Sequence, residues 1–370
     1  MPDHSDFLKR PAARASTSID HLYAAHGERD FGNPPWESAS ARFLILRLSP
    51  FRDVERSTPH EFLFREVRSA VPDAYVDFGF FPVARDRQAL ESAGVPLMHG
   101  IASARGALDF DVILVSNSYT LELVNLAPYL TGSGFPSSRM ERDAAGGRGG
   151  VRYPLVILGG SNAMASAAVN DPRTGDSLVD AVFFGEGEGR VAALAERLAG
   201  ASRLEGSIRS AELEAIGREI PGFWPTASSM PARQAKASPE AYPSGVPPVL
   251  AGDEAGTMRL EITRGCPSFC SFCFEGWERK PFRERPVESI LAEARRLKAG
   301  IGADTVELAS YNFNAHSAIV DIIKSLQDMF WSVSFQSQRV DILARSPGLV
   351  RFEAVAGKRS FTVEIGRAHV

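Results

Sequence analysis

The chain has no cysteine outside one eight-residue window, which excludes a disulfide-stapled scaffold. It has no apolar run near the ~20 residues that a membrane-spanning helix needs. The net charge of −4 over 370 residues gives no electrostatic footprint for nucleic acid, and there is no basic arm. The N-terminus lacks the basic and apolar regions of a signal peptide. These absences predict a cytoplasmic protein without a membrane partner.

The cysteines that are present, Cys266, Cys270 and Cys273, lie at spacings of four and three. Three thiols in so short a loop can converge on one metal centre. They cannot close the four-coordinate shell of a structural zinc by themselves. They can hold three irons of a 4Fe–4S cluster and leave the fourth iron open for a reactive ligand.

Two other interpretations of the cysteines remain open. The loop can be a non-catalytic Fe–S or zinc module, with Glu275 or an imported histidine as the fourth ligand. The thiols can also be packing residues only, although loop cysteines at metal spacing are poor packing elements.

The residues around the cysteines predict alternating strands and helices of a parallel sheet. The pattern predicts strands and helices in the order Met258–Thr263 (strand), Pro286–Lys298 (helix, with Gly300 just past its end), 305–309 (strand), 315–329 (helix) and 331–336 (strand). The cysteines therefore follow the first strand, at the carboxyl-terminal edge where such folds place their active sites.

A Cys-x3-Cys-x2-Cys loop after the first strand of a (β/α) barrel, with an aromatic residue before the last cysteine, resembles the radical S-adenosylmethionine (radical SAM) superfamily. The resemblance implies that Cys266, Cys270 and Cys273 hold a 4Fe–4S cluster and that Phe272 contacts the adenosyl group. It implies that S-adenosylmethionine (SAM) chelates the open iron and is cleaved reductively to a 5′-deoxyadenosyl radical. It also implies an electron donor such as flavodoxin or ferredoxin.

Two further segments match that family less closely. The second strand ends in Glu307–Asn312 without the usual glycine pair, so backbone carbonyls or Ser310 would meet the methionyl amine. Ser337-Gln-Arg339-Val-Asp resembles the family's Ser-x-Arg-Val-Asp segment, which implies that Ser337 and Arg339 approach the cosubstrate. An arginine fits a carboxylate bidentately. The alternative is that Arg339 is only a surface salt-bridge partner.

Upstream of the barrel, apolar runs predict a separate domain with an open, doubly wound parallel sheet. The predicted strands are Arg42–Leu48, Asp111–Ser116, Pro154–Gly159 and Val179–Phe184. A ligand of such a sheet lies beyond the carboxyl ends of the strands. The glycines in the loops there can equally serve only tight strand-to-helix turns.

These loops together resemble the Rossmann-like, cobalamin-binding-type domain that precedes many radical SAM barrels. The resemblance implies cobalamin contacts from the strand-end loops, at Ser116, Ser118, Gly159, Gly160, Gly185 and Glu186. One departure is the absence of the Asp-x-His-x-x-Gly loop that supplies a cobalt-ligating histidine in the best-known cobalamin domains. From the resemblance of the strand-end loops, cobalamin-dependent methyl transfer is one expectation for this chain.

Composition shifts predict the domain boundaries. We expect an irregular lead-in (1–40), a cobalamin-binding-type domain (41–220), a linker (221–256), an incomplete radical SAM barrel (257–363) and a non-native tail (364–370). Residues 139–152 are expected to form a surface insertion, and Phe223–Pro225 a docking contact within the linker. A fourth barrel strand is expected at Ser360–Val363, and the abrupt end after it suggests a fragment of a longer protein.

The leading hypothesis is therefore a radical SAM enzyme. Its substrate, a small molecule, a peptide or an RNA, is not identified by any motif.

Overall fold

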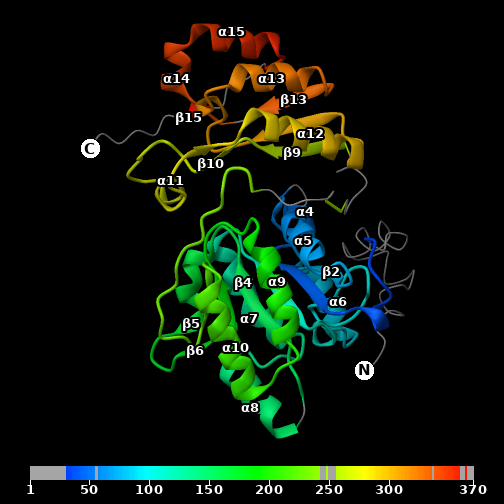
Figure 1. The fold of residues 1–370 in the computed structure, drawn as a ribbon. Coiled ribbons are helices and arrows are strands. Elements are labelled where there is room, and N and C mark those ends of the chain that lie inside the picture. Colours follow the sequence, from blue (N-terminus) through cyan, green and yellow to red (C-terminus); the bar gives the residue numbers. More distant parts are fainter. Residues whose placement is uncertain are drawn as a thin grey trace. The chain divides into compact units, whose positions relative to one another are not determined.

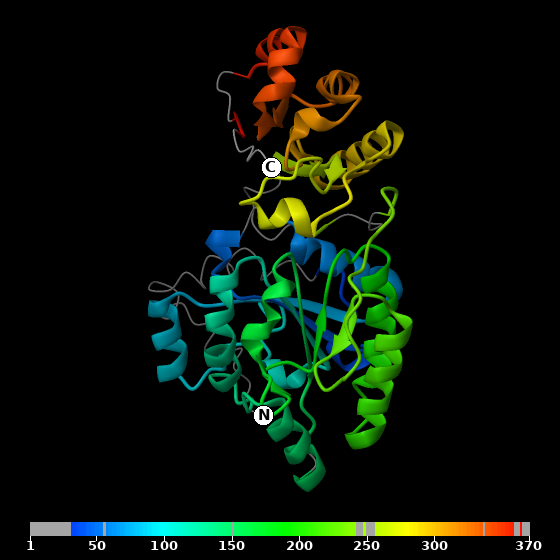
Figure 2. The same cartoon turned by 90° about the vertical axis from the view of Figure 1, so that its left-hand side faces the viewer.

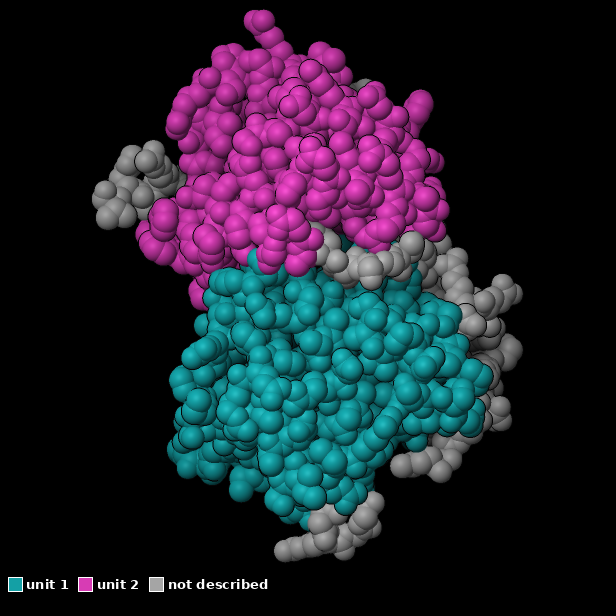
Figure 3. Space-filling model, in the orientation of Figure 1, with its two compact units in different colours: residues 1–237, 242–251 teal, residues 238–241, 252–370 magenta. Residues whose placement is uncertain are grey.

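The computed structural model describes residues 31–54, 57–149, 151–241, 247–248, 256–335, 337–358 and 363–364. The chain divides into two compact units (Figures 1 and 3). Unit 1 comprises residues 1–237 and 242–251, and unit 2 comprises residues 238–241 and 252–370. Among the described residues, no helix is long and apolar enough to span a membrane.

Unit 1 is built on a six-stranded sheet with the order β2-β1-β3-β4-β7-β8. Its strands are β1 (Arg42–Arg47), β2 (Tyr75–Phe80), β3 (Val112–Ser116), β4 (Leu155–Gly159), β7 (Ala181–Phe183) and β8 (Phe223–Pro225). All pairs are parallel except β7 with β8. In β1, Phe43 and Ile45 enter one core while Leu44 and Leu46 enter the other. Since both faces of the sheet are buried, its strands are continuous apolar runs.

Helices cover both faces of this sheet (Figure 2). One core contains residues of α5 (Pro59–Ala70), α9 (Arg190–Ala201) and α10 (Gly206–Glu219). The other contains residues of α6 (Ala84–Ser92) and α7 (Leu126–Thr131). The chain passes from β1 outward to β2 and returns to β3 on the other side of β1, so the strand order reverses between β1 and β3. The doubly wound fold is confirmed, and its topological switch point lies between these two strands.

Two strands of this sheet were not predicted. In β2, Asp77 and Gly79 interrupt the apolar pattern; the Asp77 carboxylate is buried and accepts hydrogen bonds from the backbone of Ala102 (3.0 Å) and Ser103 (2.8 Å). The predicted linker begins too early, because Phe223–Pro225 forms β8. Pro225 is tolerated there because β8 is an edge strand.

Residues 31–40 were assigned to an irregular lead-in, yet they pack on unit 1. The ring of Phe31 meets Phe78 edge-on at 5.4 Å, and the ring of Trp36 meets Tyr75 at 4.8 Å. Residues 1–30 lie outside the described part of the chain.

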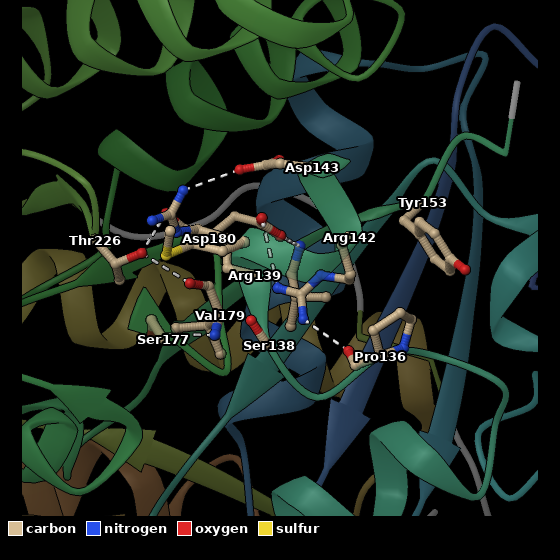
Figure 4. A network of polar contacts seen from close by, with 12 residues as sticks. Pro136, Ser138, Arg139, Arg142, Asp143, Tyr153, Ser177, Val179, Asp180 and Thr226 are labelled. Carbon is tan, nitrogen blue, oxygen red and sulfur yellow. Dashed lines mark hydrogen bonds and ion pairs between the residues drawn. The ribbon is translucent and has the colours of Figure 1, made fainter. Parts of the chain in front are cut away.

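The predicted surface insertion is instead a helix, α8 (Arg139–Gly149), held at the amino-terminal edge of the sheet (Figure 4). The guanidinium of Arg142 is buried, lies 3.5 Å from the Asp180 carboxylate and donates to the Pro136 carbonyl at 3.1 Å. Asp180 also accepts the backbone N–H of Val156 at 2.7 Å. These contacts between distant segments could not be predicted from the glycine-rich sequence of the insertion.

Unit 2 contains a three-stranded parallel sheet with the order β13-β12-β9. Its strands are β9 (Thr257–Glu261), β12 (Thr305–Ala309) and β13 (Ser332–Phe335), with helices α12 (Val287–Ile301) and α13 (Ile319–Gln327) between them. Alternate strand residues, such as Leu260 and Val306, enter one core with the two helices. This arrangement of βα units is the predicted partial barrel.

Two predicted helix boundaries in unit 2 need correction. Helix α12 runs through Gly300 and stops before Gly302, whose φ of +69° ends it. Helix α13 begins later than expected, because a 3-10 turn at Phe313–Ala315 precedes it. After β13 come β14 (Gln338–Arg339), α14 (Val340–Arg345), α15 (Pro347–Val355) and β15 (Val363–Glu364). Most of the fourth strand expected at 360–363, and residues 365–370 of the expected tail, lie outside the described residues.

Candidate functional site

The cysteine loop follows β9 and begins with a turn that only glycine can make. Gly265 has φ of +73°, and a Cβ on it would lie 2.2 Å from the carbonyl oxygen of Arg279. Cys266, Cys270 and Cys273 are not in disulfides, and each is partly exposed. In the described ranges, no three His, Cys, Asp or Glu side chains are grouped tightly enough to hold a metal ion.

Hydrogen-bond donors lie against the sulfur atoms of Cys273 and Cys266. The backbone N–H of Gly276 lies 3.3 Å from Cys273 Sγ, and Asn312 Nδ2 lies 3.5 Å from Cys266 Sγ. N–H groups of this kind also lie against the cysteine sulfurs of iron–sulfur sites, where they help to set the reduction potential of the cluster. Because the three cysteines form no disulfide and share one partly exposed loop, they offer the donor set of a cluster with three cysteine ligands.

The segment directly after the cysteines braces the loop from one side. Trp277 Nε1 donates to the Cys270 carbonyl at 2.9 Å, and Lys280 Nζ donates to the carbonyls of Cys266 and of Ser268, the latter at 2.7 Å. Three carbonyl oxygens of the cysteine loop are therefore engaged by side chains within seven to fourteen positions of them. The loop is held by its own sequence neighbours.

The ends of the other two strands reach the same edge. Ser310, after β12, shares a hydrogen bond of 2.6 Å with Thr263, which precedes the cysteine loop. Arg339, after β13, donates to the hydroxyl of Ser268 inside the loop. The carbonyl of Ser337 accepts the backbone N–H of Phe313 at 3.1 Å. Parallel strands bring these predicted residues together because their carboxyl ends meet at one edge. The fourth predicted contact, Phe272, has an exposed side chain on the loop.

Arg339 is not merely a surface salt-bridge partner. Its Nε does pair with Asp341 at 2.8 Å, but its side chain is only 15% exposed and it also contacts the cysteine loop. The proposed fourth ligand, Glu275, accepts a hydrogen bond from the Tyr311 hydroxyl.

Sequence reasoning missed Asn312, Asn314 and Lys280. The first donates to a cysteine sulfur, the second holds the backbone of Arg339, and the third lies against the loop. The only local signal was a pair of asparagines two positions apart after a strand end. Asparagine side chains in such loops often form hydrogen bonds with the nearby backbone.

In unit 1, a buried arginine lies at the switch point. Arg47, the last residue of β1, is fully buried and donates to the hydroxyls of Ser116 (3.2 Å) and Ser118 (2.9 Å). Burial lowers the pKa of Arg47, and the nearby charge of Glu122 opposes that shift. The two serines predicted as ligand contacts are thus held by a side chain that sequence reasoning did not single out.

The Glu122 carboxylate fills the loop that follows β3. It accepts the backbone N–H groups of Ser118 (2.7 Å) and Tyr119 (3.1 Å) and the hydroxyl of Ser49 (2.6 Å). Paired backbone N–H groups at such a strand end commonly bind phosphate. Since a carboxylate of the chain itself occupies them here, the loop does not offer them to an anionic ligand.

The predicted glycine contacts are explained by chain packing. A Cβ on Gly160 would lie 2.2 Å from the Asn117 carbonyl, and one on Gly185 would lie 2.2 Å from the Ala235 carbonyl. The Gly159 carbonyl accepts the Asn117 N–H at 2.8 Å. Glu186 accepts the N–H of Ala237 at 2.7 Å. The alternative of tight turns therefore accounts for Gly160 and Gly185.

Apolar side chains are exposed beside this switch point. Tyr119 is 68% exposed, and Leu121 (81%) and Val124 (70%) lie on the 3-10 helix Thr120–Asn125. Met164, on the 3-10 helix Ala163–Val169 after β4, is also exposed. We call these four residues the switch-point apolar patch.

Two family models match the chain. The model described as "Radical SAM proteins, N-terminal" matches residues 61–224, and the model described as "Radical SAM superfamily" matches residues 260–351. The second range contains the three cysteines and Arg339. The chain belongs to the radical SAM superfamily. This is the superfamily that the cysteine pattern had suggested.

Curated relatives match this radical SAM protein over short stretches. The ribosomal protein uS12 methylthiotransferase RimO of Geobacter sulfurreducens is 38% identical over 80 residues, 22% of this chain and 18% of RimO. The tRNA-2-methylthio-N(6)-dimethylallyladenosine synthase of Sphingopyxis alaskensis is 35% identical over 71 residues, 19% of this chain and 16% of that enzyme. The chain thus spans less than two thirds of either relative.

Among solved structures, the radical SAM methyltransferase TsrM from Kitasatospora setae, with cobalamin and a [4Fe-4S] cluster bound, is similar at a TM-score of 0.44. The identity is 16%, over 78% of this chain and 52% of TsrM. This similarity is remote.

Proposed function

We propose that Cys266, Cys270 and Cys273 hold a 4Fe–4S cluster at which the chain cleaves SAM reductively. The observation that carries this proposal is the contact between Arg339 and Ser268, because it joins the end of the third strand to the middle of the cysteine loop. When bound, the cluster and SAM supply a one-electron reductive cleavage of a carbon–sulfur bond. The electron would come from a donor such as flavodoxin or ferredoxin.

The side chains at this edge would bind and orient the cosubstrate. Arg339 supplies a fixed cation for its carboxylate, a bidentate pairing that lysine cannot reproduce. Ser310 and Ser337 supply oxygen atoms at the ends of the neighbouring strands. Phe272 offers an exposed aromatic face to the adenine ring.

Unit 1 is proposed to bind cobalamin at its switch point. A large macrocycle with apolar faces fits the switch-point apolar patch. The Glu122 carboxylate disfavours a nucleotide that would bind there through its phosphate groups, because it already occupies the backbone N–H groups of the loop. Ser118, held by Arg47, would contact the ring's amide substituents, whereas Ser116 is buried and would help to hold Arg47 in place. The chain has no Asp-x-His-x-x-Gly loop, so no histidine of that motif would bind the cobalt.

The names of the curated relatives suggest the class of reaction. One is named a methylthiotransferase of ribosomal protein uS12, and the other a synthase of a 2-methylthio-modified adenosine of tRNA. We propose a methyl or methylthio transfer to a peptide or an RNA, with a small-molecule acceptor as the alternative.

The test of the central proposal is anaerobic reconstitution with iron and sulfide, followed by reduction, addition of SAM and an assay for 5′-deoxyadenosine. The product should form with the wild type and vanish in Cys270→Ala. Ser271→Ala is the matched control, because Ser271 is an exposed neighbour in the same loop. A cluster that forms without cleaving SAM would favour a non-catalytic Fe–S module. A folded protein that binds zinc but no cluster would overturn the proposal.

A further inference from the structure

Lys280 lies against the cysteine loop with its charge turned inward. Its Nζ donates to the carbonyls of Cys266 and Ser268 and lies 3.9 Å from the ring centroid of Phe269. These residues belong to the first half of the loop, between the first two cysteines. The loop therefore folds around an ammonium group.

This charge is not cancelled by an ion pair. In the part of the chain that the structure describes, no carboxylate lies within 4.0 Å of Lys280 Nζ, whereas the neighbouring Arg279 pairs with Glu278 at 2.7 Å. The partners of Lys280 are carbonyl dipoles and an aromatic face, which hold a cation without neutralising it. Its field thus persists at the loop.

A cation in this position has a defined effect on a redox centre. Reducing an iron–sulfur cluster adds one negative charge, and net charge and hydrogen bonding around the cluster set its reduction potential. A nearby positive charge stabilises the reduced form more than the oxidised form, by Coulomb attraction in a partly buried environment.

We propose that Lys280 is a positioning residue that closes the cysteine loop and, through its charge, makes the bound cluster easier to reduce. This inference rests on the proposed function, because it requires a cluster on the three cysteines. Among the residues that the structure describes, Lys280 Nζ makes no hydrogen bond to a cysteine sulfur.

The experiment compares Lys280→Arg and Lys280→Gln in the reconstituted chain. Arginine keeps the charge, whereas glutamine keeps N–H donors and loses the charge. The readouts are iron and sulfide content and the midpoint potential of the cluster, from a dye-mediated titration followed by electron paramagnetic resonance. Neither readout depends on turnover of SAM.

Lys298→Gln is the matched control. Lys298 Nζ also donates to a carbonyl, that of Met329, and lies 5.0 Å from the Phe330 ring centroid. It therefore has the same local chemistry as Lys280, but it lies at the amino-terminal edge of the sheet, since Met329 precedes β13.

We expect Lys280→Gln to have a more negative midpoint potential, with Lys280→Arg and Lys298→Gln close to the wild type. A glutamine variant with full cluster content and an unchanged potential would overturn the inference while leaving the proposed function intact. Loss of the cluster in the glutamine variant but not in the arginine variant supports loop closure by the charge. Loss in both overturns the inference, and a wild type without a cluster overturns the proposed function with it.

Discussion

Asn314 and Arg339 are joined by two reciprocal hydrogen bonds. The side-chain oxygen of Asn314 accepts the Arg339 N–H at 2.9 Å, and its Nδ2 donates to the Arg339 carbonyl at 3.0 Å. Asn314 is buried and follows β12, whereas Arg339 follows β13. One side chain thus imitates a strand partner and fixes the backbone from which the arginine reaches the cysteine loop.

Replacing Asn314 with alanine should weaken SAM binding without removing the cluster. The loss of two buried hydrogen bonds releases the Arg339 backbone, and we expect the Kd for SAM to rise about tenfold. Asn314→Asp keeps the hydrogen-bond acceptor but not the donor, so its Kd for SAM should lie between those of the wild type and Asn314→Ala. Asn125→Ala is the control, because Asn125 makes a comparable amide contact, to the Leu48 carbonyl at 2.8 Å, in unit 1. An equal loss of affinity in both variants would indicate general destabilisation instead.

Arg339→Met should lower SAM affinity by roughly 10- to 100-fold, the range for losing a charge-assisted hydrogen bond. Arg339→Lys should recover only part of it, since lysine lacks the planar fork. Arg345→Met separates this role from the shared ion pair, because Arg345 also pairs with Asp341, at 2.9 Å. Anaerobic equilibrium dialysis with SAM measures the effect. Unchanged binding in Arg339→Met would remove this residue from the cosubstrate site.

Gly160→Ala should destabilise unit 1 by roughly 3 kcal/mol, from a left-handed backbone plus overpacking. Gly160 has φ of +104°, and its added Cβ would lie 2.2 Å from a backbone oxygen. Gly175→Ala is the matched control, because its φ is +71° and nothing lies within 4 Å of the added Cβ. That variant should lower the free energy of unfolding by only about 1 kcal/mol. Urea unfolding measures both, and equal losses would contradict the close approach.

His60 should make unit 1 sensitive to acid. Its ring is fully buried between Phe78 and Phe80, and in the described ranges neither ring nitrogen has a hydrogen-bond partner. Burial, aided by the charge of Arg47, lowers the pKa of His60 from 6.5 to about 3. Below pH 6.5, His60 therefore binds a proton in the unfolded chain but not in the folded chain.

Stability should accordingly fall as pH drops from 6.5 toward 3, by at most about 1.4 kcal/mol per pH unit from this group. In His60→Leu this contribution should vanish, so the wild type should lose stability relative to the variant on acidification. The measurement is the urea midpoint of unit 1 at several pH values. Parallel curves for the two proteins between pH 4 and 6.5 would contradict it.

Local patterns carried much of the fold. β12 was predicted with its observed bounds, and β1, β3, β4 and β13 within about two residues at either end, because each is an apolar run or an alternation. β2 was missed since Asp77, buried under the N–H groups of a distant loop, looks polar in sequence. Helix α8 was missed because its anchor, Asp180, lies far along the chain.

The sequence by itself determined the candidate ligand set, because three cysteines at fixed spacing in a short loop need no distant partner to define one. It also determined which edge of the sheet carries them. The tertiary structure alone decided what surrounds that loop: the Asn314 clamp on Arg339, the inward charge of Lys280, and Arg47 behind Ser116 and Ser118. Those contacts depend on strand order and on loop paths. Strand order and loop paths leave no periodic signal in the sequence. Each of these contacts joins one pair of residues, and either residue could equally bind many other partners.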